Sequence, residues 1–274
     1  MLLLFGKGLM KKTLIAILTC LIVSPFAITQ KSTDASVEGA RATLIQFIEF
    51  SNREALRSEQ ARRLLVAEAA SWDVPSFGKL ADAPDKLVLL DKNLAVGRVQ
   101  WFGENNYVAD MYFYLEFDGT WKIGAMRRLA LTGMVEDLYF ALKAKKNLSP
   151  EEKDTLANIE LVLASDKVLK EWFAHNRELL DQLYNLIRSK VGGESLYIND
   201  SDKRFPEVAQ SLKRLHLSGV NVQANGNVEI VIGGMLDNTV GFMYSPSKNP
   251  PSISPSSNIW VEEVTDKWYL FRTT

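Results

Sequence analysis

Arg127 is the residue whose type and position most directly suggest chemistry. Pairing Phe117 with Trp121 across the turn at 118–119 places Met111 opposite Arg127 on an otherwise apolar strand face. A guanidinium inside an apolar pocket needs an anionic partner and can hold a carboxylate through two parallel hydrogen bonds. Alternatively, the aliphatic stem lies on apolar surface while the charged head reaches solvent. The pattern leaves both interpretations open.

The opposite strand face carries unlike charges at neighbouring positions. The same register puts Asp110 beside Arg128, and pairing Trp101 with Tyr107 puts Arg98 beside Asp110. Opposite charges directly across a ladder stabilise it, so we expect a structural row Arg98–Asp110–Arg128. Two neighbouring arginines should lower the pKa of Asp110 and make it a poor base at neutral pH.

These side chains belong to three β-rich runs between Asn93 and Gly133, with one apolar and one mixed face. Helical spacing predicts a helix from Val37 to Ile48, and the capping-box pattern from Ser51 to Glu54 predicts the start of a second. A strand at Lys86–Leu90 leads into the hairpins. Helices followed by an antiparallel meander indicate an α+β fold with a curved sheet.

This segment resembles a known superfamily. The sequence ATLIQFIEFSNREALR is similar to the first helix, and ADMYFYLEFDGTWKIGAMR to the last long hairpin, of the nuclear-transport-factor-2-like, or ketosteroid-isomerase-like, cone proteins. The resemblance covers residues 36–133. It implies a sheet wrapped around helices with a pocket at the open end of the cone. Members include enzymes, binding modules and assembly domains, so the fold alone transfers no activity.

A cone pocket would collect a small set of residues: Trp72, Trp101, Tyr107, Met111 and Arg127. An apolar pocket with one cation suits a hydrophobic acid. Relatives with isomerase activity use a pocket carboxylate as base and a tyrosine as oxyanion donor. The resemblance offers Asp110 with Tyr107, Tyr112 or Tyr114 for these roles, but the predicted register separates Asp110 from Tyr107 and surrounds it with arginines. We therefore assign no catalytic residue.

The remaining chain predicts a helical connector at 134–193 and a small α+β domain at 194–274, after the cone-like domain at 34–133. Within the connector, Ser149-Pro-Glu-Glu152 is typical of a helix start, and the pair Gly192-Gly193 ends a long helix. The last domain should hold a helix from Pro206 and five strands. A helix followed by the sequence GNVEIVIGGMLDNTVGFMYSP and the ending WYLFR is faintly similar to small bacterial immunity-type domains. The proline- and serine-rich interval Ser245–Asn258 predicts a surface loop.

The N-terminus predicts export. Lys11 and Lys12 precede a short apolar run broken by Pro25, which is typical of a signal peptide over residues 1–27, with Met10 a possible initiator. The alternative is a lipoprotein through Cys20, although Thr19 is unfavourable for a lipobox. Cys20 is the one cysteine, so the exported chain would have no disulfide. These features predict a periplasmic or secreted protein.

The composition limits the classes of partner and cofactor that we expect. The net charge is −1 and the pI about 6.2, which gives no electrostatic footprint for nucleic acid. The two histidines, His175 and His216, lack metal-ligand spacing, so we expect no metal and no cofactor. We expect an exported, non-enzymatic module that binds a small apolar or anionic ligand or an envelope protein. The alternatives are an inhibitor or immunity-type protein acting through its C-terminal domain, and a ketosteroid-isomerase-like enzyme.

Overall fold

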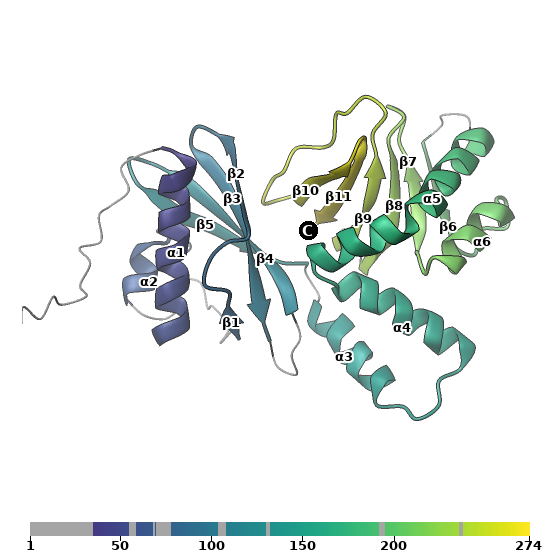
Figure 1. Ribbon diagram of the computed structural model, residues 1–274, viewed down its shortest axis with the longest axis horizontal. Helices are drawn as coiled ribbons and strands as arrows, with labels where there is room; N and C mark the ends of the chain where they lie inside the picture. Colours follow the sequence, from purple (N-terminus) through teal and green to yellow (C-terminus); the bar gives the residue numbers. More distant parts are fainter. Residues whose placement is uncertain are drawn as a thin grey trace, which may run out of the picture. The chain divides into compact units, whose positions relative to one another are not determined.

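Two antiparallel sheets dominate the computed structural model, which describes residues 35–54, 59–67, 69, 78–103, 108–129, 132–191, 195–235 and 238–274. One sheet curls into a half-barrel, and helices account for much of the remaining chain (Figure 1). The predicted α+β class with a curved sheet is therefore confirmed. The predicted domain boundaries stay a prediction.

The first sheet has the order β1-β3-β4-β5, with β2 also beside β3. Its strands are β1 (Lys79–Leu80), β2 (Lys86–Asp91), β3 (Leu94–Phe102), β4 (Val108–Phe117) and β5 (Trp121–Arg127). Two helices precede them, α1 (Val37–Glu54) and α2 (Glu59–Arg63). The predicted helix start at Ser51 is wrong, because α1 continues through this position. Asn52 exchanges two 2.9 Å hydrogen bonds with the backbone of Leu80 in β1, so a tertiary contact overrides the local start signal.

One face of this sheet is filled by α1 (Figure 1). Leu44, Phe47 and Ile48 of α1 form a buried cluster with Met111 and Phe113 of β4. The helix lies close because β3 has a glycine there: a Cβ at Gly97 would be 2.4 Å from a Leu44 methyl carbon. Side chains therefore pack the described concave side of the sheet.

The β4–β5 register is correct near the turn and wrong beyond Gly124. Phe117 pairs with Trp121 and Leu115 with Ile123, as predicted. A β-bulge then shifts the register, so that Tyr112, not Met111, pairs with Arg127. A one-residue shift moves every later side chain to the other face. Arg127 consequently leaves the apolar face on which it was expected.

The β3–β4 register differs from the prediction by two residues. Arg98 pairs with Tyr112 rather than Asp110, and Trp101 pairs with Ala109 rather than Tyr107. Because side chains alternate with a period of two, this shift leaves each residue on its expected face and changes only its neighbours.

The second face of the sheet is buried as well, which the sequence pattern did not predict. Tyr112 and Tyr114 are buried beside Ile259 and Trp260 of β10 (Asn258–Thr265). Tyr112 and Trp260 stack with ring centroids 5.3 Å apart, and the Tyr114 hydroxyl donates to the Ile259 carbonyl at 2.9 Å. The mixed face of the sheet therefore packs against the C-terminal part of the chain.

Three helices follow the first sheet: α3 (Thr132–Lys143), α4 (Pro150–Leu163) and α5 (Asp166–Val191). Ser149 caps α4 in a complete capping box with Glu152, which confirms the predicted start. The last helical residue of α5 is Val191, and the glycine pair predicted to end it lies outside the described residues. No helix among the described residues combines the length and apolar character needed to cross a bilayer.

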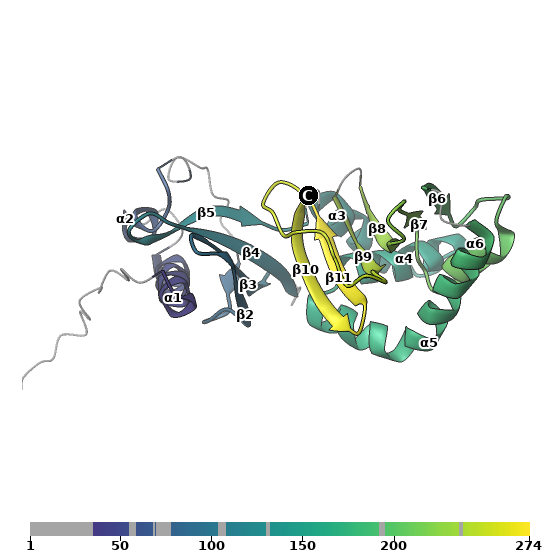
Figure 2. The ribbon, with the colours of Figure 1, turned by 90° about the horizontal axis from the view of Figure 1, so that it is seen from above.

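The second sheet has the order β10-β11-β9-β8-β7-β6. The five predicted strands are present as β7 (Gly219–Val222), β8 (Val228–Met235), β9 (Asn238–Tyr244), β10 and β11 (Trp268–Thr273), together with an unpredicted β6 (Leu196–Asn199). The predicted helix is α6 (Pro206–Arg214). In Figure 2, α5 lies along one side of β7, β8 and β9, where Phe173 packs on Phe242 and Trp268.

Candidate functional site

Arg98 is the centre of a buried charge cluster. Its Nη1 donates to Asp166 Oδ2 at 2.8 Å and to Glu262 Oε2 at 2.7 Å, while its Nη2 donates to Asp85 Oδ2 at 2.7 Å. The side chain is only 5% exposed. One arginine of β3 thus contacts the loop before β2, the first residue of α5, and β10.

A second arginine, Arg272, forms an ion pair with Asp166. Arg272 of β11 donates from Nε to Asp166 Oδ1 at 2.8 Å and from Nη2 to the Ala164 carbonyl at 2.7 Å. The hydroxyl of Tyr112 adds a 2.9 Å hydrogen bond to Asp166 Oδ2. Asp166 is fully buried at the N-terminus of α5, where the helix dipole also favours a negative charge.

The pKa of Asp110 rises to about 6, because burial and the nearby charge of Asp166 outweigh the attraction of Arg272 and Arg98. The predicted lowering of this pKa is therefore wrong. The sequence pattern identified a neighbouring arginine but gave no sign that the carboxyl group would be taken out of water.

Glu262 completes the cluster at its more exposed side. Lys86 and Lys170 donate to Glu262 Oε1 at 2.8 and 3.0 Å, and the Trp260 indole donates to Oε2 at 3.2 Å. Burial opposes ionisation, but the two lysines and Arg98 lower the pKa of Glu262 to about 2. The cluster balances its charges: the carboxylates are Asp85, Asp110, Asp166 and Glu262, and the cations are Arg98, Arg272, Lys86 and Lys170.

The predicted row Arg98–Asp110–Arg128 is only half present. Arg98 and Asp110 share a face and both belong to the cluster, but Asp110 lies opposite Gln100 in the ladder. Arg128 follows β5 and places its guanidinium 5.6 Å from the ring centroid of Trp101. The bulge in β5 removes it from the row.

The described members of the predicted ligand pocket do not converge. Met111 is buried against α1, with Trp101 packed on the same cluster. Arg127 lies on the other face, where its Nε donates to the Pro255 carbonyl at 2.9 Å and its Nη1 to the Met126 carbonyl at 3.0 Å. The last two members, Trp72 and Tyr107, lie outside the described residues.

Arg127 instead anchors the proline- and serine-rich interval. Its bond to Pro255 holds the end of this segment, and Ile253 packs on the cluster around Tyr112 and Trp260. Ile253 and Asn258 form an isolated bridge. The predicted surface loop is therefore attached to the first sheet near its end.

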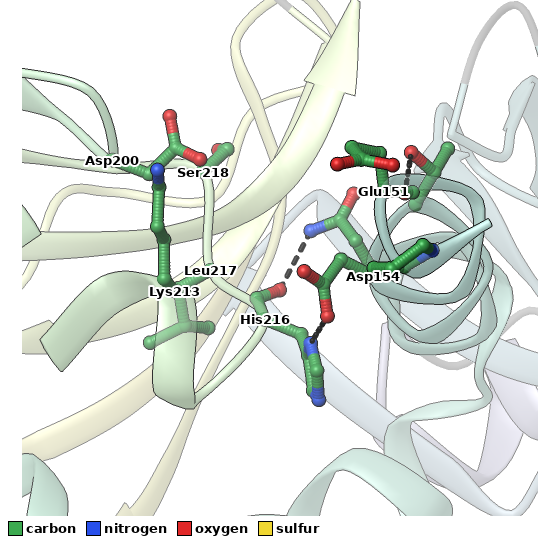
Figure 3. A pocket seen from close by; sticks show the side chains of 10 residues that line it. Glu151, Asp154, Asp200, Lys213, His216, Leu217 and Ser218 are labelled. Atoms are coloured by element: carbon green, nitrogen blue, oxygen red, sulfur yellow. Dashed lines mark hydrogen bonds and ion pairs between the residues drawn. The ribbon is translucent and has the colours of Figure 1, made fainter. Parts of the chain in front are cut away.

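A separate hollow of about 500 Å³ lies between α4 and the connection from α6 to β7 (Figure 3). We call it the α4 cleft. It is lined by Pro150, Glu151, Asp154, Thr155, Asn158, Asp200, Lys213, His216, Leu217 and Ser218.

Specific contacts hold the walls of the α4 cleft. The Asn158 side-chain amide donates to the carbonyls of His216 and Ile232 at 2.8 and 2.6 Å. His216 has a φ of 54°, in the left-handed region that costs free energy for a residue with a Cβ. Its Nδ1 lies 3.5 Å from Asp154 Oδ1. The local sequence pattern gave no signal for this arrangement of His216.

The α4 cleft carries an excess of negative charge. Figure 3 shows Glu151 and Asp154 on α4 facing the wall that bears His216 and Lys213, with Lys213 extending toward Asp200. No group of histidine, cysteine and acidic side chains in the described part of the chain is arranged to hold a metal ion. The chemistry that this lining supports is the binding of a polar, positively charged group.

Comparisons with known proteins identify no relative: no family model, no curated protein and no solved structure matches this chain.

Proposed function

We propose that this protein is an exported, non-enzymatic binding protein of the bacterial envelope and that the α4 cleft is its ligand site. The basic and apolar N-terminal segment supports export. The observation that carries the binding role is the hollow itself, whose volume of about 500 Å³ suits a small molecule. Its position differs from the cone pocket expected from sequence, because α1 fills the described concave side of the first sheet.

The charges of the cleft favour a ligand with an ammonium group. Three carboxylates, Glu151, Asp154 and Asp200, surround the hollow, against one ammonium group on Lys213. The side chain of Asp154 is 70% exposed, so each charge contributes little in water. We therefore expect dissociation constants of about 0.1–1 mM for a small amine.

Binding rather than catalysis is favoured by the state of Asp110. This carboxyl group was the candidate base, but it accepts the Asp166 amide and faces two buried arginines. Its exposed fraction is 7%, and it does not line the α4 cleft. A general base must come within hydrogen-bond reach of a substrate proton. The arrangement of Asp110 supports a structural role instead.

The two histidines allow a direct binding experiment. His216 lines the cleft, whereas His175 lies exposed on α5 and serves as an internal control. Titration with putrescine, lysine and glutarate, which has no ammonium group, should move the imidazole NMR signals of His216 for the two amines, and those of His175 for none. A His175→Gln variant assigns the signals.

Matched substitutions then test the charge argument. Asp154→Asn should weaken putrescine binding about threefold to fivefold, whereas Asp82→Asn, an exposed acid elsewhere, should not. If none of the three probes moves the His216 signals, or if Asp154→Asn leaves the affinity unchanged, the cleft is not this kind of site. Cell fractionation of the full chain and of a chain lacking residues 2–27 tests export separately.

A further inference from the structure

The exposed side of α3 carries large apolar side chains. Met134 is 59% and Leu138 46% exposed, and Ala141 continues the same side one turn later. Residues four and three positions apart lie on one helix face, so these three form a continuous stripe. The neighbouring side of α3, one position further along the chain, packs Val135, Tyr139 and Leu142 on α4. The stripe is therefore additional to the surface that α3 needs for its own packing.

The charges around this stripe are self-complementary. Asp137 lies four residues before Ala141, and Lys145 lies four residues after it. The helix α3 ends at Lys143, and the turn after it keeps Lys145 next to the helix end, because the amides of Ala144 and Lys145 donate to the carbonyls of Phe140 and Leu142 at 3.0 and 3.1 Å. Lys145 pairs with Glu152 on one side and keeps 51% of its side chain exposed.

We propose that the α3 stripe, Met134, Leu138 and Ala141, packs antiparallel against the same stripe of a second copy of this chain. A twofold axis beside Ala141 brings Asp137 of each copy opposite Lys145 of the other. The small side chains of Ala141 and Ala144 allow the two helices to approach closely, and Leu138 packs beside Ala144 of the second copy. This interaction goes beyond the proposed ligand binding and uses no residue of the α4 cleft.

The symmetry of the charges favours a second copy over other occupants. A twofold interface requires that the same patch complement itself, with residue i on j and residue j on i. Equal spacing of an acid and a base on either side of Ala141 satisfies this condition. An anionic lipid surface would instead bring its negative charge against Asp137 at the stripe.

Sedimentation equilibrium of the purified chain across a concentration series tests the proposal. We expect a monomer–dimer equilibrium in which Leu138→Lys weakens association at least tenfold, because it places a charge in an apolar contact. Leu89→Lys is the matched control, since Leu89 is also an exposed leucine, at 38%, but lies on β2. A chain that stays monomeric, or a dimer that Leu138→Lys does not weaken, would overturn the proposal.

A charge exchange tests the antiparallel geometry. Asp137→Lys and Lys145→Asp should each weaken the dimer about tenfold, since two pairs per dimer become repulsive. The double variant should recover most of the wild-type affinity, although Lys145→Asp also removes the contact with Glu152. Melting temperatures show that each variant is folded. Failure of the double variant to recover, or binding of the stripe to phosphatidylglycerol vesicles in place of dimerisation, would contradict the proposal.

Discussion

The backbone amide of Asp166 donates a 2.5 Å hydrogen bond to Oδ2 of Asp110, 56 residues earlier in the chain. This bond joins the first residue of α5 to the third residue of β4. It also brings a second carboxyl group close to that of Asp166, so two acids share a buried site with Arg98 and Arg272. The cost of burying both negative charges appears in the raised pKa of Asp110.

The first prediction concerns the pH dependence of stability. Asp110 has a pKa of about 6 in the folded protein and an ordinary value of 3.8. Between these values the folded protein binds a proton that the unfolded chain releases, so this group lowers the free energy of unfolding as pH rises from about 4 to 6. Asp110→Asn should remove that slope, because asparagine has no carboxyl group to titrate. The fold should be kept, because the amide oxygen still accepts from the Asp166 backbone amide. Urea denaturation from pH 4.5 to 7.5 measures it.

Glu262 changes the free energy of unfolding with pH in the opposite direction to Asp110, and over a different pH range. Its pKa is lowered from 4.5 to about 2, so its stabilisation is present above pH 4.5 and is lost as pH falls toward 2. The range from pH 4.5 to 6 therefore reports on Asp110.

For the Asp110→Asn variant, the control is Asp91→Asn, which removes an acid at an exposed position. Parallel curves for Asp110→Asn and wild type would show that Asp110 does not titrate in this range.

The second prediction is that Arg98→Met strongly destabilises the fold. Removal of this guanidinium leaves Asp166 and Glu262 buried with fewer cationic partners, which typically costs about 3–5 kcal/mol. Arg98→Lys should recover little, because one ammonium group cannot reproduce hydrogen bonds from three guanidinium nitrogens. The free energy of unfolding in urea checks both, with the exposed Arg53→Met as control. A loss below about 1 kcal/mol would mean that the ion pairs contribute little.

The third prediction concerns Arg127. Arg127→Met should remove the hydrogen bond to Pro255 and destabilise the protein by about 1–2 kcal/mol. The larger effect should be local, with faster hydrogen exchange around residues 253–258. Arg128→Met should leave that exchange unchanged, because Arg128 lies over Trp101 instead. Equal exchange in wild type and Arg127→Met would argue against the anchoring role.

The fourth prediction concerns the start of α4. Ser149 accepts from the Glu152 amide while the Glu152 carboxylate accepts from the Ser149 amide. Ser149→Ala should lower the free energy of unfolding by about 1 kcal/mol, since it leaves a helix amide without its cap. Thermal unfolding measures the loss, and Ser256→Ala, in the interval before β10, provides a control. An unchanged melting temperature would show that solvent replaces the cap.

Local signals were enough for most helices and strands of this fold. The turn at 118–119 set the first pairs of β4 with β5, and Ser149 with Glu152 set the start of α4. Alternation placed Arg98 and Asp110 on one face even though the β3–β4 register was two residues off. These features depend on residues close in sequence, whose geometry follows from turn, cap and strand preferences.

The sites depended on contacts that no local pattern contains. The bulge at Gly124 moved Arg127 to the other face, and nothing in an alternating run marks where it will skip a residue. Asp166, Glu262 and Arg272 reach Arg98 or Asp110 from distant segments, and the α4 cleft forms where α4 meets the turn at His216. Sequence by itself therefore determined most of the helices and strands and most strand faces, but not the end of α1 or the presence of β6. Tertiary structure decided which charges are buried together, because desolvation and ion pairing act between segments that meet only after the chain has folded.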